Sequence, residues 1–434
     1  MQEPIDVTDR MRKEWNERAR EDAHFYVAFG RREQNDDEFF ETAREVVSGL
    51  EWELRRFPAR ENRRAWRALE IGCGPGRLIK PMSRHFGEIH GVDVSDEMIL
   101  RARQNLRGIA HAHVHATSGA DLAQFADESF HLVYSYAVFQ HIPSRDVVMQ
   151  YLRETQRVLR PGGLLRCQIN GLDKTAKTYD TWSGVRIDAD EVREYALEND
   201  MQLLALEGVR TQYMWTTMRK RSKGWRLPQS TGPARIRRVT NAHNSEPVVP
   251  LCGRFASFTM WIESLPSDCD LIGLSVFVGG VAVNPCYIGP PEADGLQQVN
   301  VLMRDIGRTG ILPLDVFCND SKICETVGLR VIPPGPLVPH ILSITDGINM
   351  MSGTRVSSGS VKVTIEEAED LSDFRAEIDG KTVSGIDIFC ADPLPPRYEI
   401  NFDLPAGVAP GNHSLEISLG RRVLGRDNLE IVGA

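Results

Sequence analysis

The chain has 434 residues, of which 41% are hydrophobic and 26% charged, a composition that is ordinary for a globular protein and a length that suits two to four domains. Its formal net charge of -9 gives no overall positive field that would draw the molecule to nucleic acid or to an anionic membrane. The first residues are polar and charged, and no window approaches the roughly 20 apolar residues of a membrane span, so the sequence predicts a cytoplasmic protein.

A glycine-rich turn between a strand and a helix stands out after an N-terminal helical segment, Arg10–Gly30. In LEIGCGPGRLIK an apolar run leads into Gly72, Gly74 and Gly76, so the spacing is G-x-G-x-G and not the dinucleotide G-x-G-x-x-G. Glycines allow positive φ and a close approach of the backbone to a ligand, and the N–H groups of the next helix can bind a carboxylate. The pattern favours a nucleoside cofactor with an amino-acid tail.

Two acidic residues follow the next two strand-like runs. Asp93 ends the run EIHGVDV, 17 residues after Gly76, where a carboxylate can accept hydrogen bonds from both ribose hydroxyls. Asp121 follows the run HAHVHA. The alternating histidines of that run, His111, His113 and His115, have a metal-like spacing, but a fourth ligand is missing and a place in the sheet is the favoured interpretation, so we expect no metal.

Two further strand patterns, within 126–143 and 158–169, complete an alternation of strands and helices that predicts βαβ units and a mainly parallel sheet. After the last of them come Asn170 and the aromatic run KTYDTWSG (Lys177–Gly184). Tyr179 and Trp182 can stack on a ring or a sugar, and packing of these aromatics in the core is the alternative.

The composition changes near residue 220. The basic residues of the segment Met218–Arg238 are Arg219, Lys220, Arg221, Lys223, Arg226, Arg235, Arg237 and Arg238, beside Trp225. They can bind phosphates, although a solvated interdomain linker is the favoured interpretation.

Short alternating strands broken by Gly, Pro, Asp and Asn fill the rest of the chain, which is typical of β-sandwiches. The stretch Gln298–Val316 aligns with Glu399–Ile417, and Val276–Val283 with Ala376–Val383, a repeat of about 100 residues with a proline-rich joint at Ile332–His340. The second copy, with IDGKTV and LPAGVAPGNHSL, resembles immunoglobulin-like domains of the IPT/TIG type.

The cysteines are concentrated in this second half. Cys318 and Cys324 can form a disulfide, supply two metal ligands or remain idle thiols. Idle thiols are favoured, because zinc ligands are usually spaced more tightly and a second pair is missing.

Taken in order, the glycine turn, Asp93, Asp121, SFHLVYSYAVFQHI and LRPGGLL resemble the successive cofactor motifs of class I S-adenosylmethionine (SAM)-dependent methyltransferases, over about residues 10–220. The resemblance implies a Rossmann-like α/β domain with SAM as cofactor. The cofactor-binding residues that it implies are Glu70, Gly72, Cys73, Gly74 and Gly76 at the methionine and ribose end, Asp93 on the ribose diol, Val94 and Met98 beside the adenine, Asp121 on the adenine amine, Leu122 over the ring, and Ser135 and Tyr136 after the fourth strand.

Two details qualify the resemblance. His131 stands where such families usually have a strand-start Asp, which we expect to be structural, and Cys73 is expected to be a small packing residue. In similar enzymes the N-terminal segment folds over the cofactor as a lid, so Tyr26 can touch cofactor or acceptor, with core packing equally favoured.

Methyl transfer needs aligned acceptor, methyl and sulfur with water excluded, and a base only where the acceptor has a proton to lose. Gln140 and His141 follow the fourth strand, where the acceptor should sit, and His141 is the candidate general base because imidazole titrates near neutrality. Positioning of the substrate and a purely structural role are the alternatives for this histidine.

The sequence therefore predicts four segments: a methyltransferase domain over 1–217 with N-terminal lid helices, a basic linker over 218–240, and immunoglobulin-like sandwiches over 241–338 and 339–434. The expected function is SAM-dependent methylation, above all O-methylation, of a small molecule or a glycan, with the sandwiches contacting a protein or a polysaccharide. The alternatives are a nucleic-acid or protein methyltransferase that uses the basic linker, and a non-catalytic SAM-binding scaffold. The acidic balance makes nucleic acid the weaker partner.

Overall fold

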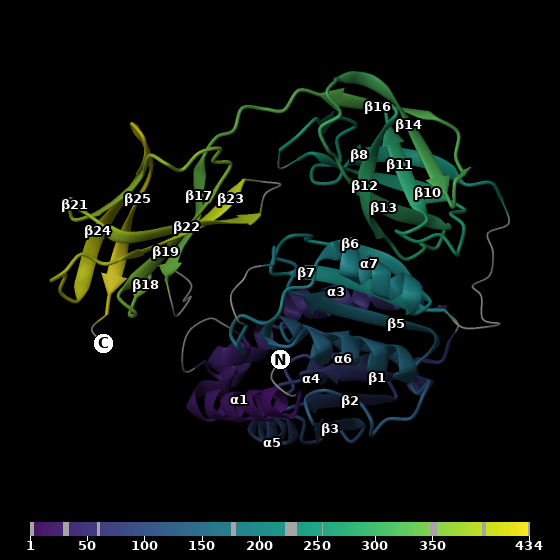
Figure 1. The fold of residues 1–434 in the computed structure, drawn as a ribbon, viewed down its shortest axis with the longest axis horizontal. Coiled ribbons are helices and arrows are strands. Elements are labelled where there is room, and N and C mark those ends of the chain that lie inside the picture. The colour runs from purple at the N-terminus through teal and green to yellow at the C-terminus, as the bar shows by residue number, and fades with distance from the viewer. Residues whose placement is uncertain are drawn as a thin grey trace. The chain divides into compact units, whose positions relative to one another are not determined.

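The computed structural model describes residues 4–28, 34–58, 61–174, 179–221, 232–253, 255–347, 354–392 and 396–432 (Figure 1). Two compact units can be distinguished. The first comprises 1–23, 36–249 and 257–332, and the second comprises 24–35, 250–256 and 333–434. Each unit is considered by itself below.

A Rossmann-like sheet forms the first part of the first unit, with strand order β3-β2-β1-β4-β5-β7-β6. The strands are β1 (Arg67–Ile71), β2 (Glu88–Asp93), β3 (Ala112–Ala116), β4 (Phe130–Ser135), β5 (Leu159–Ile169), β6 (Met201–Glu207) and β7 (Met214–Lys220). Strands β1 to β5 pair in parallel, whereas β7 is antiparallel to both β5 and β6. The order reverses between β1 and β4, and ligands bind at the carboxyl ends of strands beside such a switch point.

Helices precede and connect these strands. They are α1 (Pro4–Val27), α2 (Asp36–Glu41), α3 (Arg44–Glu53), α4 (Ile79–Met82), α5 (Asp96–Asn105), α6 (Arg145–Val158) and α7 (Ala189–Glu198), with short 3-10 turns at η1 (Leu54–Arg56), η2 (Arg63–Ala65), η3 (Ser83–His85) and η4 (Phe139–His141). Side chains that bond the first-turn N–H groups start three of the helices: Ser95 for α5, Ser144 for α6 and Asp188 for α7. Helix α1 is interrupted at Asp22, whose φ of -162° is extended. Among the helices of the described residues, none is long and apolar enough to span a bilayer.

The apolar core of this domain lies between the sheet and helices α3, α4 and α5. Its fully buried members include Leu50, Ile79, Ile89, Ala102 and Leu132. The glycine loop enters the same cluster through Cys73, which is 2% exposed. Packing of this thiol therefore leaves little room opposite it on β2.

The second part of the first unit is all β. Its strands are β8 (Arg235–Asn241), β9 (Val249–Pro250), β10 (Ser257–Glu263), β11 (Leu274–Val278), β12 (Val281–Ile288), β13 (Leu296–Leu302), β14 (Gly310–Cys318), β15 (Ser321–Lys322) and β16 (Val327–Ile332). They pair as β8-β10-β13-β12 and as β9-β16-β14-β11. Strand β12 belongs to both sets, because Val281–Val283 pair with β11 and the residues from Asn284 onward pair with β13.

Strand β12 also joins this β region to the Rossmann-like sheet. Tyr287 pairs with Ala205 of β6, so the two sheets are continuous. The Tyr287 hydroxyl accepts a hydrogen bond from the Trp52 indole at 2.7 Å and donates one to Glu53 at 3.2 Å. Glu53 in turn pairs with Arg56 at 2.5 Å, and both side chains are nearly inaccessible. The joint is thus a buried, hydrogen-bonded contact.

The second unit contains two sheets around one core. Its strands are β17 (His340–Asp346), β18 (Arg355–Val356), β19 (Ser360–Glu366), β20 (Phe374–Ile378), β21 (Lys381–Thr382), β22 (Ser384–Asp392), β23 (Arg397–Asp403), β24 (Gly411–Leu419) and β25 (Arg422–Ile431). The orders are β17-β19-β23-β22 and β18-β25-β24-β20-β21. Buried residues of both sheets, such as Val363, Phe402, Ala376 and Ile417, form a single cluster, as in a β-sandwich.

The two β regions share one topology. The set β8-β10-β13-β12 corresponds to β17-β19-β23-β22, and β9-β16-β14-β11 corresponds to β18-β25-β24-β20. The sequence repeat falls on matching strands: Val276 pairs with Val316 in the first region, and Ala376 pairs with Ile417 in the second. The aligned glycines Gly310 and Gly411 both begin a strand at positive φ.

The segment predicted as a basic linker is ordered at both ends. Residues up to Lys220 lie in β7, and β8 begins at Arg235. Arg219 donates to Gln202 at 3.2 Å, and Lys220 donates to the Leu159 carbonyl at 2.7 Å. Lys223, Trp225 and Arg226 lie outside the described residues.

Neither Cys318 nor Cys324 forms a disulfide. The thiol that contacts Cys318 is Cys269, in the loop before β11, and not Cys324. Among the described residues, no group of three metal-binding side chains comes together. The histidines of β3 have other partners: His115 stacks on His90, and His111 contacts the Ser83 carbonyl.

Gly91 on β2 provides a test of the loop packing. A Cβ at this position would lie 2.3 Å from Ile79 Cδ1 and 2.8 Å from Cys73 Sγ, so Gly91→Ala is expected to destabilise the protein by about 1–3 kcal/mol through overpacking. Gly49→Ala is the matched control, because a Cβ there, in helix α3, meets nothing within 4 Å and should stabilise by about 0.5–1 kcal/mol. Urea unfolding of the full chain measures both; equal effects of the two substitutions would refute the tight packing.

Candidate active site

The glycine turn and the end of β2 form one hydrogen-bonded unit. Gly72, Gly74 and Gly76 all have positive φ, between 50° and 85°. The Gly74 N–H donates to Asp93 Oδ2 at 2.8 Å, and the Ser95 N–H donates to Asp93 Oδ1 at 2.8 Å. Both carboxylate oxygens are therefore fixed in direction at the carboxyl end of β2, and each keeps a lone pair for a ligand.

Burial and backbone hydrogen bonds shift the pKa of Asp93 in opposite directions. Burial raises its pKa to about 6, although the N–H donors from Ser95 and Gly74 favour the ionised form. Asp93 as a whole residue is partly buried. A hydroxyl donor or a nearby cation beside the carboxylate would stabilise the charge.

A second carboxyl group, Glu70, lies one strand away. It is 3% exposed and accepts a hydrogen bond from the Tyr134 hydroxyl at 3.1 Å. Burial raises the pKa of Glu70 to about 8, with Tyr134 and the charge of Arg77 acting in the opposite direction. Arg77 is itself buried, donates to Thr42 Oγ1 at 3.0 Å and lies 5.4 Å from the centroid of the Tyr136 ring.

The residues after β4 pack against the glycine loop. Ser135 donates to the Ile71 carbonyl at 2.9 Å, and Tyr136 stacks on Trp215 with ring centroids 5.5 Å apart. A Cβ at Gly72 would lie 2.3 Å from Val138, so only glycine fits where the loop passes β4. Ser135 therefore holds the end of β1 that leads into the loop, and half-buried Tyr136 lies beside the loop.

The residues expected beside the adenine follow β2 and β3. Val94 packs against Gly119, because a Cβ at Gly119 would lie 2.7 Å from Val94 Cγ2. Met98 is buried in the first turn of α5. Asp121 accepts hydrogen bonds from Ser118 Oγ at 2.7 Å and from the Ala123 N–H at 3.0 Å. Its carboxylate is thus oriented by the turn that carries it.

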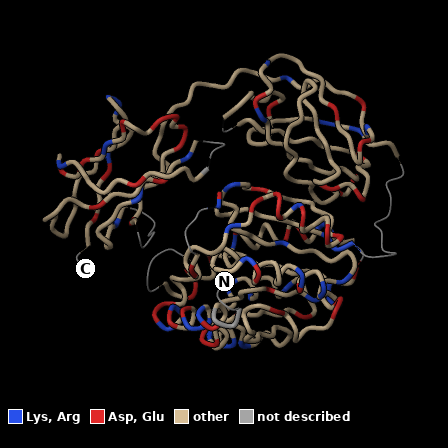
Figure 2. Tube along the Cα trace, in the orientation of Figure 1, with Lys and Arg blue, Asp and Glu red and all other residues tan. Residues whose placement is uncertain are grey.

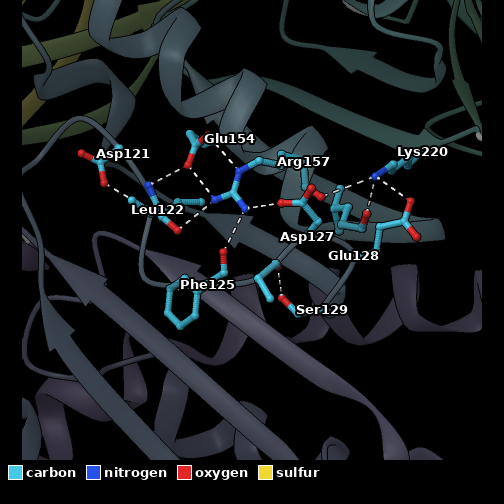
Figure 3. A network of polar contacts seen from close by, with 12 residues as sticks. Asp121, Leu122, Phe125, Asp127, Glu128, Ser129, Glu154, Arg157 and Lys220 are labelled. Atoms are coloured by element: carbon cyan, nitrogen blue, oxygen red, sulfur yellow. Dashed lines mark hydrogen bonds and ion pairs between the residues drawn. The ribbon is translucent and has the colours of Figure 1, made fainter.

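Arg157 of α6 anchors that turn (Figure 3). Its guanidinium donates to the Leu122 carbonyl at 3.1 Å, to the Phe125 carbonyl at 2.9 Å and to Asp127 at 2.6 Å. Glu154, which pairs with Arg157, accepts the Leu122 N–H at 3.2 Å. Both backbone groups of Leu122 are therefore held by one ion pair on α6.

Gln140 and His141 lie in η4, directly after β4, and both are almost fully buried. His141 Nδ1 lies 3.2 Å from the Thr181 carbonyl, and its Nε2 lies 3.2 Å from Gln140 Nε2. Gln168 of β5 completes the chain by donating to Gln140 Oε1 at 2.6 Å. Burial, followed by the charge of Arg18, lowers the pKa of His141 to about 4, so the ring is neutral at physiological pH.

The segment after β5 runs beside this histidine. Asn170 donates to the Gly184 carbonyl at 3.4 Å, and the Gly184 N–H donates to the Gln140 carbonyl at 2.7 Å. Trp182, 47% exposed, has its ring centroid 6.3 Å from that of His141. Tyr179 is half-buried at the start of the described part of this segment.

Helix α1 covers the loops at the carboxyl ends of the strands. Arg12 donates to the Thr117 carbonyl at 2.6 Å, Asn16 accepts from Ser95 Oγ at 2.7 Å, and Arg20 pairs with Glu97 at 2.9 Å. These residues are four apart and so share one helix face. Tyr26 lies beyond the interruption at Asp22, in the part of α1 that belongs to the second unit, and contacts Phe25.

Sequence reasoning missed five residues that organise this site: Arg18, Arg77, Arg157, Gln168 and Thr181. Gln168 had a readable signal, since a glutamine interrupts the apolar run LLRCQI of a central strand. The others act through tertiary contacts that no local pattern encodes. His131 is structural, because its two ring nitrogens bond the Arg67 N–H and Arg160.

Part of the chain is similar to known proteins. Residues 69–167 match the family described as "Methyltransferase domain". Ubiquinone biosynthesis O-methyltransferases from Ruegeria pomeroyi and Roseobacter denitrificans are 35% and 33% identical over 115 residues, 26% of this chain and 44% of each relative. A malonyl-[acyl-carrier protein] O-methyltransferase from Enterobacter lignolyticus is 27% identical over 192 residues, 44% of this chain and 70% of that protein.

The fold, the glycine turn with Asp93 and the family match identify a SAM-dependent methyltransferase domain at the start of the chain, with SAM as its cofactor. The chain spans less than half the length of the ubiquinone-pathway relatives that it matches. The acceptor and the activity of the whole protein are therefore taken up as proposals.

Arg157 offers a test of the turn that carries Asp121 and Leu122. Arg157→Met removes the donors to Leu122 and Phe125, so SAM and S-adenosylhomocysteine are expected to bind about tenfold more weakly, a loss of about 1.4 kcal/mol. Arg153→Met is the matched control on the same helix, because exposed Arg153 bonds only Gln150 among the contacts described. Calorimetric titration measures both; an unchanged Kd in folded Arg157→Met would exclude this role.

Proposed function

We propose that the chain is a SAM-dependent O-methyltransferase that acts on a hydroxyl group of a small molecule or a glycan. The observation that carries the proposal is the neutral, buried His141 at the end of β4. Its Nδ1 faces the Thr181 carbonyl, so the proton resides on Nδ1 and the lone pair on Nε2. A neutral imidazole with an available lone pair is what a hydroxyl acceptor requires of a base.

The chain's own residues would divide the work as follows. Asp93 would bind the ribose hydroxyls, Glu70 and the Gly72–Gly76 turn the methionine end, and Asp121 with Leu122 the adenine. SAM supplies an electrophilic methyl group on a sulfonium centre. His141 Nε2 would accept the acceptor's hydroxyl proton, with that hydroxyl replacing the Gln140 amide, while Trp15 and Trp182 exclude water beside the ring.

The names of the relatives support the O-methyl assignment. Both the ubiquinone-pathway enzymes and the malonyl-carrier enzyme are O-methyltransferases. Gln140, Asn170, Tyr179 and Trp182 are the residues that we assign to the acceptor side. Tyr26 remains a prediction for the acceptor side.

Further proposals concern the β regions. The two regions share one strand order, which supports an immunoglobulin-like identity for both. In each region the first strand, β8 or β17, belongs to one sheet, and the short second strand, β9 or β18, belongs to the other. We propose that the two regions contact a large acceptor or a protein partner. We propose the domain limits 1–217, 218–240, 241–338 and 339–434, with the end of β7 and the start of β8 lying inside the second of these segments.

The nucleic-acid alternative is weakened by the first residues of the basic segment. Arg219 and Lys220 are buried, and Arg221 pairs with Asp270 at 2.8 Å. On β8, Arg235, Arg237 and Arg238 are exposed, and Arg237 pairs with Glu263. Lys, Arg, Asp and Glu are interspersed along the trace (Figure 2). The exposed arginines of β8 are therefore the described residues of this segment that could bind phosphates.

Cofactor binding tests the Asp93 assignment. Asp93→Ala is expected to abolish binding of SAM in calorimetry. In the wild type the Asp93 pKa lies above its ordinary value, at about 6, so a ligand that needs the ionised carboxylate should bind about tenfold more weakly per pH unit below that value. The Asp93→Asn variant should bind SAM weakly, and its affinity should not fall as the pH is lowered through this range. A pH-independent affinity between pH 4.5 and 7 would contradict the assignment, and tight SAM binding without turnover of any screened acceptor would favour the scaffold alternative.

Turnover tests the His141 assignment. His141→Ala is expected to leave the Kd of SAM unchanged and to lower kcat about 100-fold or more with a hydroxyl acceptor found by screening sugars and hydroxylated small molecules. His111→Ala is the control, since His111 lies at the amino end of β3, opposite the site. Normal turnover by His141→Ala would remove the general base from the proposal.

A further inference from the structure

Thr181 is the point at which helix α1 meets His141. Its side chain is fully buried, and its backbone carbonyl is shared by His141 Nδ1 at 3.2 Å and Arg18 Nη1 at 3.4 Å. Its hydroxyl accepts a hydrogen bond from Arg18 Nη2 at 2.9 Å and donates one to Glu14. Two residues of α1 thus hold both polar groups of Thr181.

Arg18 is itself held in place by its surroundings. Its guanidinium lies 4.7 Å from the centroid of the Trp15 ring and 5.5 Å from that of Trp182, and it pairs with Glu14 at 3.6 Å. The side chain is only 16% exposed. A planar donor group with ring contacts from both α1 and the 179–184 segment has a defined orientation, which a flexible ammonium group would lack.

The contacts on the two sides of His141 agree on one tautomer. A carbonyl can only accept a hydrogen bond, so Nδ1 facing Thr181 must carry the proton. On the other side, Gln168 donates to Gln140 Oε1 and thereby turns the Gln140 amide nitrogen toward His141 Nε2, which must accept. The lone pair therefore lies on Nε2, the nitrogen that the proposed function uses.

We propose that Arg18 is a positioning residue that holds the Thr181 carbonyl on His141 Nδ1, so that the docking of helix α1 sets the tautomer of the general base. The inference rests on the proposed function in one respect, the role of His141 as a base. It adds that the N-terminal helix does more than cover the cofactor, because the helix and the acceptor-side segment must be joined before His141 presents its lone pair on Nε2.

Loss of the Arg18 charge has a predictable electrostatic effect. The charged groups that face His141 are Arg18 from α1, which lowers its pKa, and Asp180 from the 179–184 segment, which raises it; the carbonyls of Thr181 and Trp182 also raise it. Burial remains the largest cause of the lowered pKa. Arg18→Met keeps a long apolar side chain between the two tryptophans but removes the cation and the donors to Thr181, so the pKa of His141 should move up toward its ordinary value.

The decisive measurement is the tautomer of His141, which does not depend on turnover. Nitrogen chemical shifts of 15N-histidine in the full chain, saturated with S-adenosylhomocysteine and assigned through His141→Gln, distinguish protonation at Nδ1 from protonation at Nε2. In the wild type we expect the neutral Nδ1–H form down to about pH 5. In Arg18→Met we expect a mixture of both tautomers and a titration at higher pH.

Arg20→Met is the matched control. It removes a contact of the same helix, the ion pair with Glu97, without touching Thr181, so the tautomer and the titration of His141 should stay as in the wild type. An Nε2–H form in the wild type, an unchanged Nδ1–H form in Arg18→Met, or equal changes in the two variants would overturn the proposal.

Kinetics separate this inference from the proposed function. If His141 is the base, Arg18→Met should lower kcat at least tenfold, shift the acid limb of the pH profile upward, and leave the Kd of SAM unchanged. If no hydroxyl acceptor is methylated by the wild type, the proposed function fails, whereas the tautomer experiment still decides whether Arg18 positions His141. A KM increase alone, with the acid limb unchanged, would reduce Arg18 to an acceptor-side contact and overturn the proposal.

Discussion

The candidate site depends on the close approach of the glycine loop to the end of β2. Asp93 is the residue that makes this approach stable, because its two oxygens accept the N–H groups of Gly74 and Ser95 and so join the loop to the start of α5. The close approach also requires residues without a Cβ. Glycine satisfies this at position 72, which faces Val138, and at position 91, which faces Cys73. A carboxylate that already organises two loops needs little rearrangement to accept ribose hydroxyls, which reduces the entropic cost of binding.

How much of this was readable from the sequence depends on how local each contact is. The glycine turn, Asp93 and the capped start of α5 lie within some 25 residues, and their pattern predicted both the strand–turn–helix and the cofactor class. Thr181, Arg18 and Gln168 lie on three separate segments that meet only in the folded chain, so their contacts with His141 and Gln140 could not be read from spacing. Tyr26 fitted the helical pattern, but the interruption of α1 at Asp22 places it in the second unit, and one residue of extended backbone is not visible in a periodicity.

The β half shows the same division between local and tertiary information. The repeat found in the sequence falls on strands with matching partners, because the alternation of buried residues and the strand-opening glycines are local properties. The charged residues of the expected linker were taken as solvated, whereas Arg219 and Lys220 are buried with hydrogen-bonded partners. The pairing of Tyr287 with Ala205, supported by Trp52 and Glu53, also joins the first β region to the methyltransferase sheet in a way that composition does not reveal.

The electrostatics of the site match the charge of its cofactor. Burial raises the pKa values of the carboxyl groups of Glu70 and Asp93, to about 8 and about 6, and the charge of Asp93 adds to the rise at Glu70. Arg77 compensates only in part, because it is buried and partly committed to Thr42. A bound cation lowers the pKa of nearby carboxyl groups, so a cofactor with a sulfonium and an ammonium group would favour the ionised forms of Glu70 and Asp93. If Glu70 binds the methionine end and Asp93 the ribose, as proposed above, a cationic cofactor relieves an electrostatic cost that an uncharged ligand of the same shape would leave in place.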